Sequence, residues 1–503
     1  MPMPTRSDGA MWSRLFELDT QCGISLQQQI RETLVGAILD GHIPVDVPLP
    51  SSRELARQLG VARNTVMLAY QHLVDEGYLL ARERSGFYVN PEMHRRNLAP
   101  GEPDAAAAAV EGCVRWDARL MARPSAQRNI VKPIDWERYE YPFIYGQMDP
   151  AMFPLNDWRE CYRQALSVQG VRDLVRDRLD ADDPLLVEQI RTRVLPKRGV
   201  WAAPEEILVT LGTQNALYLL AGLLVSRHTR VGIEDPGYPD ARNILQMMSD
   251  AVVPLPLDEQ GLVIGEHLDA CDYVFVTPSH QSPTTVTLPA GRRKALLERA
   301  AQAGFVIIED DYESEINFLG SPTPALKSYD RQGRVLYVGS LSKTLDPGLR
   351  IGYLVGPPDL IREARALRRL MLRHPPTNNQ HAAAQFLALG HHDALTQRLG
   401  NVYRERWQAM GEALNEHLPD TFRMPTFGGT SYWIRGPSAL DARRLAARAA
   451  EAGIFFEPGD VNFLSERPPQ HCFRLGFSSI PVERIEPGIR RLAGLIAEQL
   501  GGY

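Results

Sequence analysis

Apolar residues in the stretch 24–89 recur with the spacing of helices. The first part of this stretch repeats apolar residues at steps of three and four, at Leu26, Ile30, Leu34, Ala37 and Ile38. This spacing places the five side chains on one face of a helix that ends at Gly41. The following run, "LPSSRELARQLGVARNTVMLAYQHLVDEGYLLARERSGFYV", predicts two helices joined by a tight turn at "LGVA" and then two strands. Ser51 or Ser52 can cap the first of these two helices.

The pattern changes at about residue 97, where periodic apolar positions become few and Ala, Pro and charged residues become frequent. This composition predicts a linker. After Tyr141, helical stretches alternate with short β-branched runs such as "EILVT", "YVFVT" and "FVIIED". Such alternation predicts an α/β fold with a mostly parallel sheet. The expected parts are an N-terminal domain over residues 1–97, a linker over residues 98–140 and a large domain over residues 141–503.

Length and composition narrow the possible functions. The chain has 503 residues and is 44% hydrophobic, so we expect at least two folded units. Its formal net charge of −6 excludes a global positive field, and any contact with nucleic acid must therefore be local. The five cysteines include no C-x-x-C pair, so we expect no metal site and a reducing compartment. The sequence contains no run of about 18 apolar residues, and we expect a cytoplasmic protein with no membrane contact.

The N-terminal domain has the element order of a winged helix-turn-helix, whose second helix can enter a DNA major groove about 12 Å wide. The residues expected to contact double-stranded DNA are Arg63, Asn64 and Thr65 at the start of this helix, Arg53 on the helix before it, and Arg82 and Arg84 in the wing. Residues 1–97 carry ten arginines and no lysine against eleven acidic residues, so a solvated surface is the alternative interpretation. The runs "LPSSRELARQLGVARNTVMLAYQHLVDEGYL" and "SGFYV" resemble the winged-helix domain of the GntR family of bacterial transcription regulators, which favours DNA binding.

A lysine in the run "GSLSKTLDPGLRIGY" lies between hydroxyl residues and is followed by an arginine. A nucleotide-binding P-loop requires G-x-x-x-x-G-K-[ST], and here Leu341 and Ser342 stand where the glycine is needed. Pyridoxal phosphate makes other demands. It requires an amine, donors for its phosphate, a carboxylate for its pyridine nitrogen and an aromatic face.

The sequence offers a residue for each of these roles. Lys343 is the amine expected to form the Schiff base. The expected phosphate donors are Ser340, Ser342, Arg350 and the backbone N–H groups of Gly212, Thr213 and Gln214 in "LGTQNAL". We expect Asp310 to pair with the ring nitrogen, Tyr312 to hydrogen-bond the 3-oxygen of the ring and Tyr238 to stack on the ring. Taken singly, each of these residues also suits an ordinary structural role.

Taken together, the runs "LGTQNAL", "EDPGY", "TPSHQSP", "EDDYE", "SLSKT" and "FRLGF" resemble fold-type I aminotransferases from about Tyr141 to the end of the chain. This resemblance implies that Arg474 grips the acidic group of a bound amino compound, a role that suits the guanidinium fork. A structural ion pair is the alternative. A GntR-type domain joined to such a domain resembles the MocR subfamily of regulators. The run "TPSHQSP" matches a motif of these regulators, which implies that His280 lies by the cofactor.

The resemblance to MocR regulators implies a pyridoxal phosphate-dependent transcription regulator and not an enzyme. A small amino acid or derivative would act as the effector through aldimine exchange at Lys343, and would change how a domain-swapped homodimer binds its DNA operator. Such a protein is bacterial and cytoplasmic, and associates with the nucleoid when it is bound to DNA. Two alternatives stay open: an active aminotransferase with a fused DNA-binding module, and a DNA-binding protein whose large domain is only a dimerisation scaffold.

Three positions depart from the pattern of these families. The run "RLDADDPLL" stands where the fold often has tyrosine, glycine, aspartate and proline in succession, which puts a phosphate contact from the partner subunit in doubt. Thr285 replaces the glycine that is usual after "SPT". Asp240 stands where the GABA-sensing member has an arginine, so we expect it to contact the effector. An acid at this position would favour a diamino acid or derivative, such as an ectoine breakdown product, over GABA.

Overall fold

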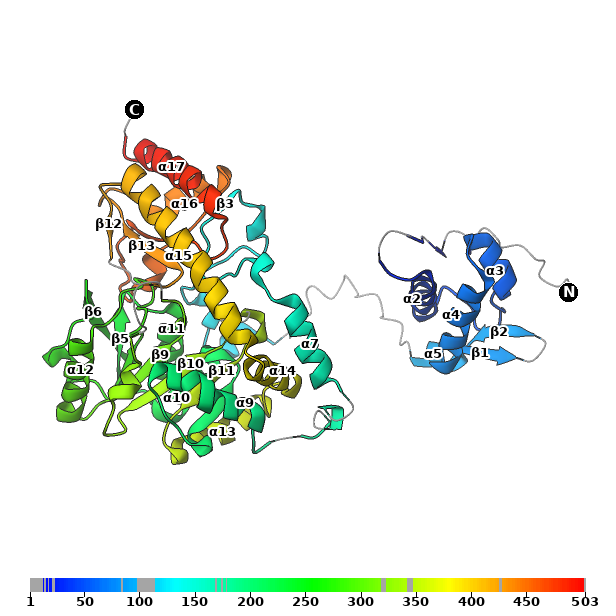
Figure 1. Ribbon diagram of the computed structural model, residues 1–503, viewed down its shortest axis with the longest axis horizontal. Coiled ribbons are helices and arrows are strands. Elements are labelled where there is room, and N and C mark those ends of the chain that lie inside the picture. The colour runs from blue at the N-terminus through cyan, green and yellow to red at the C-terminus, as the bar shows by residue number, and fades with distance from the viewer. Residues whose placement is uncertain are drawn as a thin grey trace. The chain divides into compact units, whose positions relative to one another are not determined.

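The structure is a computed structural model, and its two compact units, Met1–Arg119 and Leu120–Tyr503, are described separately (Figure 1). The residues that it describes are 12, 15, 16, 18, 19, 23–82, 85–96, 114–167, 170–172, 175–177, 179–317, 323–341, 347–424 and 428–501. None of the helices in this part of the chain combines the length and the apolar composition needed to cross a bilayer.

The first unit is a helix-turn-helix followed by a two-stranded wing, as the sequence predicts. Its elements are α2 (Leu26–Leu39), α3 (Ser52–Leu59), α4 (Arg63–Asp75), β1 (Leu79–Arg82), β2 (Gly86–Val89), α5 (Pro91–Arg96) and α6 (Trp116–Arg119). The predicted apolar face of α2 is buried at Ile30, Leu34 and Ile38, and it packs against α4. The side chain of Ser51 accepts the backbone N–H of Glu54 and so caps α3.

The turn between α3 and α4 depends on Gly60, which has a φ of 67° and ends α3 with an N–H bond to the carbonyl of Ala56. Only glycine adopts this left-handed conformation without strain. We expect Gly60→Ala to destabilise the first unit by about 1–2 kcal/mol. Amide hydrogen exchange of α3 and α4 in the full-length protein measures this effect.

Gly36 provides the matched control for this prediction. It lies inside α2, and a Cβ atom at this position meets nothing within 4 Å. Gly36→Ala is therefore expected to slow exchange, because alanine is favoured over glycine in a helix by about 1 kcal/mol. Changes of the same sign in the two variants would contradict the proposed role of Gly60.

The second unit is built on an eight-stranded mixed sheet, which confirms the predicted α/β fold. In spatial order its strands are β4 (Ile207–Thr210), β11 (Gly352–Val355), β10 (Val335–Ser340), β9 (Val306–Asp311), β8 (Tyr273–Val276), β5 (Arg230–Asp235), β6 (Ala251–Asp258) and β7 (Gly261–Leu262). The strands from β10 to β6 run parallel to their neighbours. β11 runs antiparallel to both β10 and β4, and β7 runs antiparallel to β6.

Helices and a smaller sheet complete the second unit. The helices are α7 (Leu155–Ala165), α9 (Pro184–Gln189), α10 (Gly212–Leu224), α11 (Pro239–Met248), α12 (Ala290–Ala303), α13 (Pro358–Leu372), α14 (Thr377–Ala388), α15 (His391–His417), α16 (Ala442–Glu451) and α17 (Val482–Gln499). The smaller lobe holds β12 (Phe422–Arg423), β13 (Ser431–Arg435), β16 (Cys472–Gly476) and β15 (Glu457–Pro458) in one sheet, and β14 (Ile454–Phe455) paired with β3 (Tyr141–Pro142).

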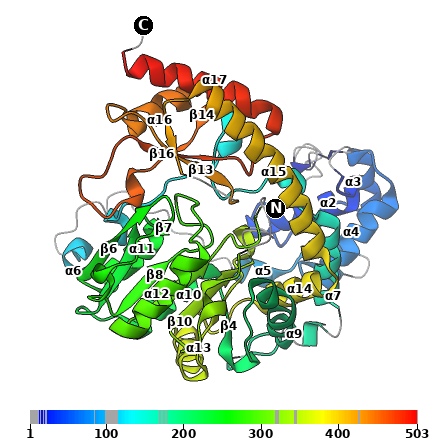
Figure 2. The same ribbon diagram turned by 60° about the vertical axis from the view of Figure 1, so that its left-hand side comes forward.

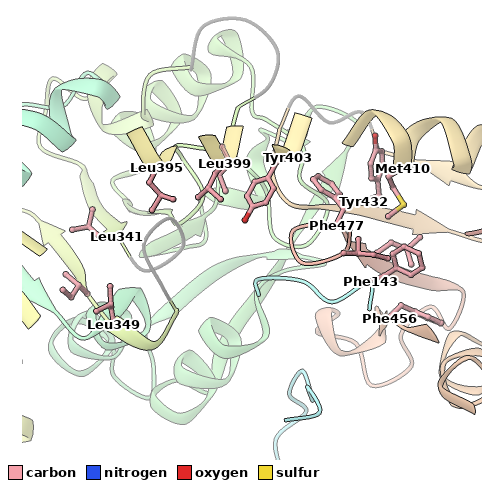
Figure 3. Packing of buried hydrophobic residues seen from close by; sticks show 14 of the residues in the cluster. Phe143, Leu341, Leu349, Leu395, Leu399, Tyr403, Met410, Tyr432, Phe456 and Phe477 are labelled. Carbon is pink, nitrogen blue, oxygen red and sulfur yellow. The ribbon is translucent and has the colours of Figure 1, made fainter. Parts of the chain in front are cut away.

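α15 connects the two lobes of this unit. It packs against α17 in the smaller lobe and against α14 in the larger one (Figure 2). Leu395, Leu399, Tyr403 and Met410 recur along one face of α15 and are buried. They belong to a single hydrophobic cluster that extends from Leu341 to residues of the smaller lobe (Figure 3). The lobes therefore share one core.

The strand directions bring distant segments to one edge of the main sheet. The carboxyl ends of the parallel strands β5, β8, β9 and β10 lie at this edge, and β4 ends there too because it has the same direction. β11 runs the other way, so it begins at this edge: its first residue, Gly352, pairs with Ser340 of β10 and with Thr210 of β4. Ligands of open α/β sheets bind outside the carboxyl ends of the strands.

Candidate functional site

A cavity lies at this edge, between the larger and the smaller lobe. It is lined by Ile130, Tyr145, Thr213, Tyr238, Ser282, Asp310, Tyr312 and Arg474. Five of these residues, Thr213, Tyr238, Asp310, Tyr312 and Arg474, are among those that the sequence analysis proposes. They come from three segments of the larger lobe and, for Arg474, from β16 of the smaller lobe. The edge geometry explains why motifs so far apart in the sequence meet here.

One end of the site is formed by the N-terminus of α10. Leu211, which precedes this helix, makes no side-chain cap, and Gly212 has a φ of 75°. The guanidinium of Arg350 lies beside this turn, with Nη2 3.4 Å from the carbonyl oxygen of Leu211. A Cβ atom on Gly212 would lie 3.0 Å from Nη2 of Arg350. Backbone N–H groups at a helix start and an adjacent guanidinium form an environment for an anion.

The backbone of Arg350 is itself unusual, because its φ is 52°. Non-glycine residues in this region carry strain, which is often found at functional sites. Ser340 ends β10 at the same edge, and the side chain of Gln214 is exposed, so only its backbone N–H suits the predicted role. Ser342 and Lys343 lie outside the described residues, and their predicted roles stay predictions.

The two neighbouring aspartates at the end of β9 have different surroundings. Asp310 is buried and lines the cavity. Asp311 points to the other face of the sheet, as alternate strand residues do, where it accepts bonds of 2.8 Å from Nε of Arg198 and from the hydroxyl of Tyr337. Arg198 also donates to Ser279 at 2.9 Å. Asp310 is therefore part of the cavity wall, while Asp311 belongs to a structural network.

Two tyrosines, Tyr238 and Tyr312, line the cavity together with Asp310, and both are held neutral. Burial raises the pKa of Tyr312 well above its ordinary value, and burial raises the pKa of Tyr238 in the same way. The hydroxyl of Tyr238 donates to Oδ2 of Asp240 at 3.0 Å. Asp240 thus faces Tyr238 and is not among the residues that line the cavity, and its contact with an effector stays a prediction.

The run "TPSHQSP" follows β8, and its Ser282 lines the cavity. His280 lines a second, smaller cavity together with Arg198 and Ser279, so its predicted position by the cofactor stays a prediction. Burial lowers the pKa of His280, which keeps the ring neutral. Thr285 has a φ of 63°, the conformation that favours glycine and that explains why glycine is usual at this position. Thr285 is therefore a strained substitution in this chain.

Glu234 joins this run to the end of β5. Its Oε2 accepts the backbone N–H of Thr277 at 3.1 Å and the hydroxyl of the same residue at 2.7 Å. The side-chain amide of Gln281 donates to the carbonyl of Pro236 at 2.9 Å and to Oε2 of Glu234 at 3.3 Å. These bonds fix the turn that carries Tyr238 against the run that carries Ser282, two residues of the cavity wall.

Glu234 makes the stability of the second unit depend on pH. Burial raises the pKa of its carboxyl from 4.5 to about 7, so between these values the folded chain binds a proton that the unfolded chain has lost. The stability that protonated Glu234 contributes to the folded state is fully present below the unfolded pKa and is lost as the pH rises to about 7. We expect Glu234→Gln, which cannot ionise, to gain stability relative to the wild type over this window. Denaturant unfolding at pH 5 and at pH 7 measures the difference, and a constant difference would contradict the assignment.

Arg474 is held by a partner within the chain. Its Nε and Nη2 donate to Oε2 of Glu457 at 3.0 and 2.6 Å, and its guanidinium lies 3.8 Å from the centre of the Tyr145 ring. The structural ion pair considered above is therefore present. Among the described residues no acceptor is found for the third nitrogen of Arg474, Nη1, and the Arg474 side chain lines the cavity. A role in binding an effector acid stays a prediction.

The predicted DNA contacts of the first unit lie at its helix-turn-helix and wing. Arg53, Arg63 and Asn64 are exposed, and Thr65 is half-buried. Arg63 begins α4, and its Nε lies 3.5 Å from the hydroxyl of Ser52 on α3. Arg82 stacks over the ring of Tyr88 at 4.3 Å, whereas Arg84 lies outside the described residues. The exposed side chains at the start of α4 are thus free of the core.

The run "RLDADDPLL" has a structural role in this chain. Asp183 caps α9 through the N–H of Leu185 at 2.8 Å. Asp182 is fully buried and accepts from Nη1 of Arg368 at 2.6 Å and from Nη1 of Arg365 at 2.7 Å. It also accepts the N–H of Val209 on β4 at 3.1 Å. This departure from the usual pattern therefore ties β4 to α13.

The residues present fit pyridoxal phosphate. The uncapped start of α10 and Arg350 suit its phosphate, and a Cβ atom on Gly352 would lie 2.7 Å from the carbonyl carbon of Gly212, so only glycine lets the two backbones approach. Asp310 suits the protonated ring nitrogen, and Tyr238 supplies an aromatic face. Within the described residues, no group of three or more His, Cys, Asp and Glu side chains could hold a metal ion.

Comparison with known proteins identifies both units. The family described as "Bacterial regulatory proteins, gntR family" matches residues 26–89, and "Aminotransferase class I and II" matches residues 177–492. The HTH-type transcriptional regulator TauR of Rhodobacter capsulatus is 43% identical over 93% of this chain and 96% of its own length. The chain belongs to the MocR-type GntR regulators. The probable rhizopine catabolism regulatory protein MocR of Rhizobium meliloti is 32% identical over 95% of both chains.

The second unit of this MocR-type regulator also resembles solved enzymes. The α-aminoadipate aminotransferase LysN of Thermus thermophilus, solved with N-(5'-phosphopyridoxyl)-L-leucine, has a TM-score of 0.69 and 27% sequence identity. The match covers 77% of this chain and all of LysN. It confirms the fold-type I aminotransferase architecture, whose family binds pyridoxal phosphate.

Four residues of the site lie outside the motifs on which the sequence analysis is based. Ile130 and Tyr145 line the cavity, Glu457 pairs with Arg474, and Lys132 pairs with Glu457. Ile130 and Lys132 fall in the stretch predicted as a linker, although they pack within the second unit. Only the strand partner of Arg474 was open to prediction, because a buried arginine requires a buried acid. Glu457 pairs with Arg474 across β15 and β16.

Proposed function

We propose that this protein is a DNA-binding transcription regulator whose second unit senses a small amino compound through pyridoxal phosphate. One observation carries the proposal: a single cavity is lined by both Asp310 and Arg474, in a chain whose residues 26–89 match the GntR family. We call the GntR-type first unit the reader. An aminotransferase-like site can bind an amine and an acid at defined positions. The reader can then turn binding of this compound into a change in DNA binding.

Bound pyridoxal phosphate would supply an electrophilic carbon that captures a primary amine. The chain's own residues would do the rest. Asp310 would hold the proton on the ring nitrogen, and Arg350, which lies beside the start of α10, would hold the phosphate together with that helix start. Lys343 would be the amine that an effector replaces. Arg474 and the cavity wall then select the effector by its acidic group.

A change at the cavity must reach the reader for regulation to occur. This requires an effector that binds two arrangements of the protein unequally, and the coupling is reciprocal between effector and DNA. The partners that we propose are a double-stranded DNA operator and a second copy of this chain, since paired readers fit paired half-sites. Domain swapping within such a homodimer also belongs to the proposal.

The reader is tested by the loss of one side chain. We expect Arg63→Ala to weaken binding of genomic fragments selected by the wild-type protein roughly tenfold, because a base or phosphate contact is worth about 1–3 kcal/mol. Arg57→Ala is the control, since Arg57 is exposed but pairs with Glu54 on its own helix at 2.6 Å. Equal losses in a fluorescence anisotropy titration would argue against a reader that begins at α4.

The sensor is tested by an absorbance titration of the purified protein with amino acids, followed for hours. A stable shift of the cofactor band that is absent in Lys343→Ala, without release of a keto acid, supports a sensor. Steady release of a keto acid supports the second candidate, an aminotransferase with a fused reader, which the similarity to LysN favours. A protein without any cofactor band would refute both.

A further inference from the structure

Residues 127–132, which we call the strap, lie across both lobes at the mouth of the cavity. Gln127 donates to the carbonyl of Asn243 on α11 at 3.0 Å. Arg128 donates to the carbonyls of Phe463 and Ser465 in the smaller lobe at 2.9 and 3.0 Å. The carbonyl of Arg128 accepts from Arg242 at 2.7 Å. The strap is thus a fixed part of the second unit.

Two strap residues reach the site. Ile130 lines the cavity together with Asp310 and Arg474. The ammonium of Lys132 donates to the carbonyl of Tyr145 and forms an ion pair of 3.5 Å with Oε1 of Glu457. Because Glu457 holds Arg474 through its other oxygen, the three side chains form the row Lys132, Glu457 and Arg474. We call this row the charge triad.

The charge triad has two positive groups and one negative group. Burial alone would raise the pKa of Glu457, but Arg474 and Lys132 hold it below its ordinary value, so the carboxylate is charged. The charge triad therefore carries a formal charge of +1, and this charge falls to zero without Lys132. The hydroxyls of Tyr145 and Tyr312, which face the same wall, stay neutral because burial raises the pKa of each.

We propose that Lys132 is a positioning residue that sets the preference of the cavity for amines bearing an acidic group. An acid bound at Nη1 of Arg474 would place a second carboxylate beside Glu457, and like charges at this distance repel. Lys132 offsets this repulsion by neutralising Glu457 from its far side. The inference rests on the proposed function. It adds the residue that allows the guanidinium of Arg474 to bind both Glu457 and the acidic group of the effector.

The strap is also close in the sequence to the first unit. Binding of an acid strengthens the attraction between Lys132 and Glu457, and by linkage a firmly seated Lys132 strengthens binding of the acid. The strap follows closely after Arg119, where the first unit ends. An amine that carries an acidic group therefore stabilises the contacts of the strap, whereas an amine without an acidic group leaves their stability unchanged.

The test compares L-2,4-diaminobutyrate with 1,3-diaminopropane, which has the same two amines and lacks the carboxylate. The variants are Lys132→Gln and Lys132→Arg, with Lys197→Gln as the control because Lys197 pairs with Asp393 at an exposed site. We expect Lys132→Gln to weaken binding of diaminobutyrate about tenfold, about 1.4 kcal/mol, and to change the affinity for diaminopropane by no more than about twofold. Lys132→Arg should retain the wild-type affinity for diaminobutyrate, and Lys197→Gln should change the affinity for neither probe.

Hydrogen exchange of residues 127–132 provides the second readout. Diaminobutyrate should slow it in the wild type but not in Lys132→Gln, and diaminopropane should slow it in neither. Equal weakening of both probes in Lys132→Gln, or no weakening of either, would overturn the role of Lys132. If the wild type carries the cofactor band but discriminates neither probe from buffer, amine sensing itself fails, which is a failure of the proposed function.

Discussion

Asp182→Asn is expected to destabilise the second unit by about 3–5 kcal/mol, the cost of leaving a buried charge without its partner. The side chains of Asp182 and Arg368 are both completely buried, with 2.6 Å between them. Nη1 of Arg368 donates to Asp182 and to the carbonyl of Val209, whereas Nε and Nη2 find no hydrogen-bond partner among the described residues. Burial already lowers the pKa of this arginine. Asparagine keeps the shape of Asp182 but removes the charge on which Arg368 depends.

Asp180→Asn, two residues away, is the matched control. Asp180 pairs with Arg369 at 3.5 Å, and its side chain is 89% exposed. Exposed ion pairs contribute about 0–1 kcal/mol, so this variant should unfold almost as the wild type does. Denaturant unfolding followed by circular dichroism separates the two cases. A loss below about 1 kcal/mol in Asp182→Asn would show that water or a rearrangement compensates Arg368.

Asp310→Asn is expected to lower the affinity for pyridoxal phosphate roughly 100-fold, about 2.7 kcal/mol. A full charge pair at 4 Å is worth about 4 kcal/mol at an effective dielectric constant of 20, and part of this is regained by solvent. The replacement is nearly isosteric, so the fold should persist. Equilibrium dialysis measures the affinity, and the position of the cofactor band reports the protonation of the ring nitrogen.

Asp258→Asn is the control for the cofactor experiment. Asp258 ends β6 in the same sheet, where it pairs with Arg292 on the surface at 2.6 Å. It does not line the cavity with Asp310, so its loss should leave the cofactor affinity unchanged. An unchanged affinity in Asp310→Asn would remove Asp310 from the pyridoxal phosphate site and leave the neighbouring residues to be reconsidered.

The fold could be predicted because its causes are local. The helical repeat of Ile30, Leu34 and Ile38 records burial of one helix face, and the β-branched runs record strands that are buried on both faces. Residues at strand ends, such as Asp310 and Tyr238, could be proposed for the site because the parallel direction of strands gathers these ends at one edge. The alternation of strand residues even separates Asp310 from Asp311 once the sheet is known.

The remainder of the site depends on contacts that leave no local pattern. Lys132 lies in a stretch short of periodic apolar residues, and only the docking of the strap brings it to Glu457. The partner of Arg474 is fixed by the pairing of β15 with β16, which neither strand specifies alone. Asp182 replaces a residue of a familiar motif, and its role became apparent only through Arg368, nearly two hundred residues later.

The reversed strand β11 also has a consequence for synthesis of the chain. β4 is the first strand of the main sheet to be made, and all four of its residues are buried. Among the described strands, its one neighbour in that sheet is β11, which is made about 140 residues later. At about 5–20 residues per second, the ribosome needs roughly 7 to 28 seconds to supply it. During this interval an apolar strand is without its partner, so the nascent chain is most exposed to aggregation, and most in need of chaperones, before β11 emerges.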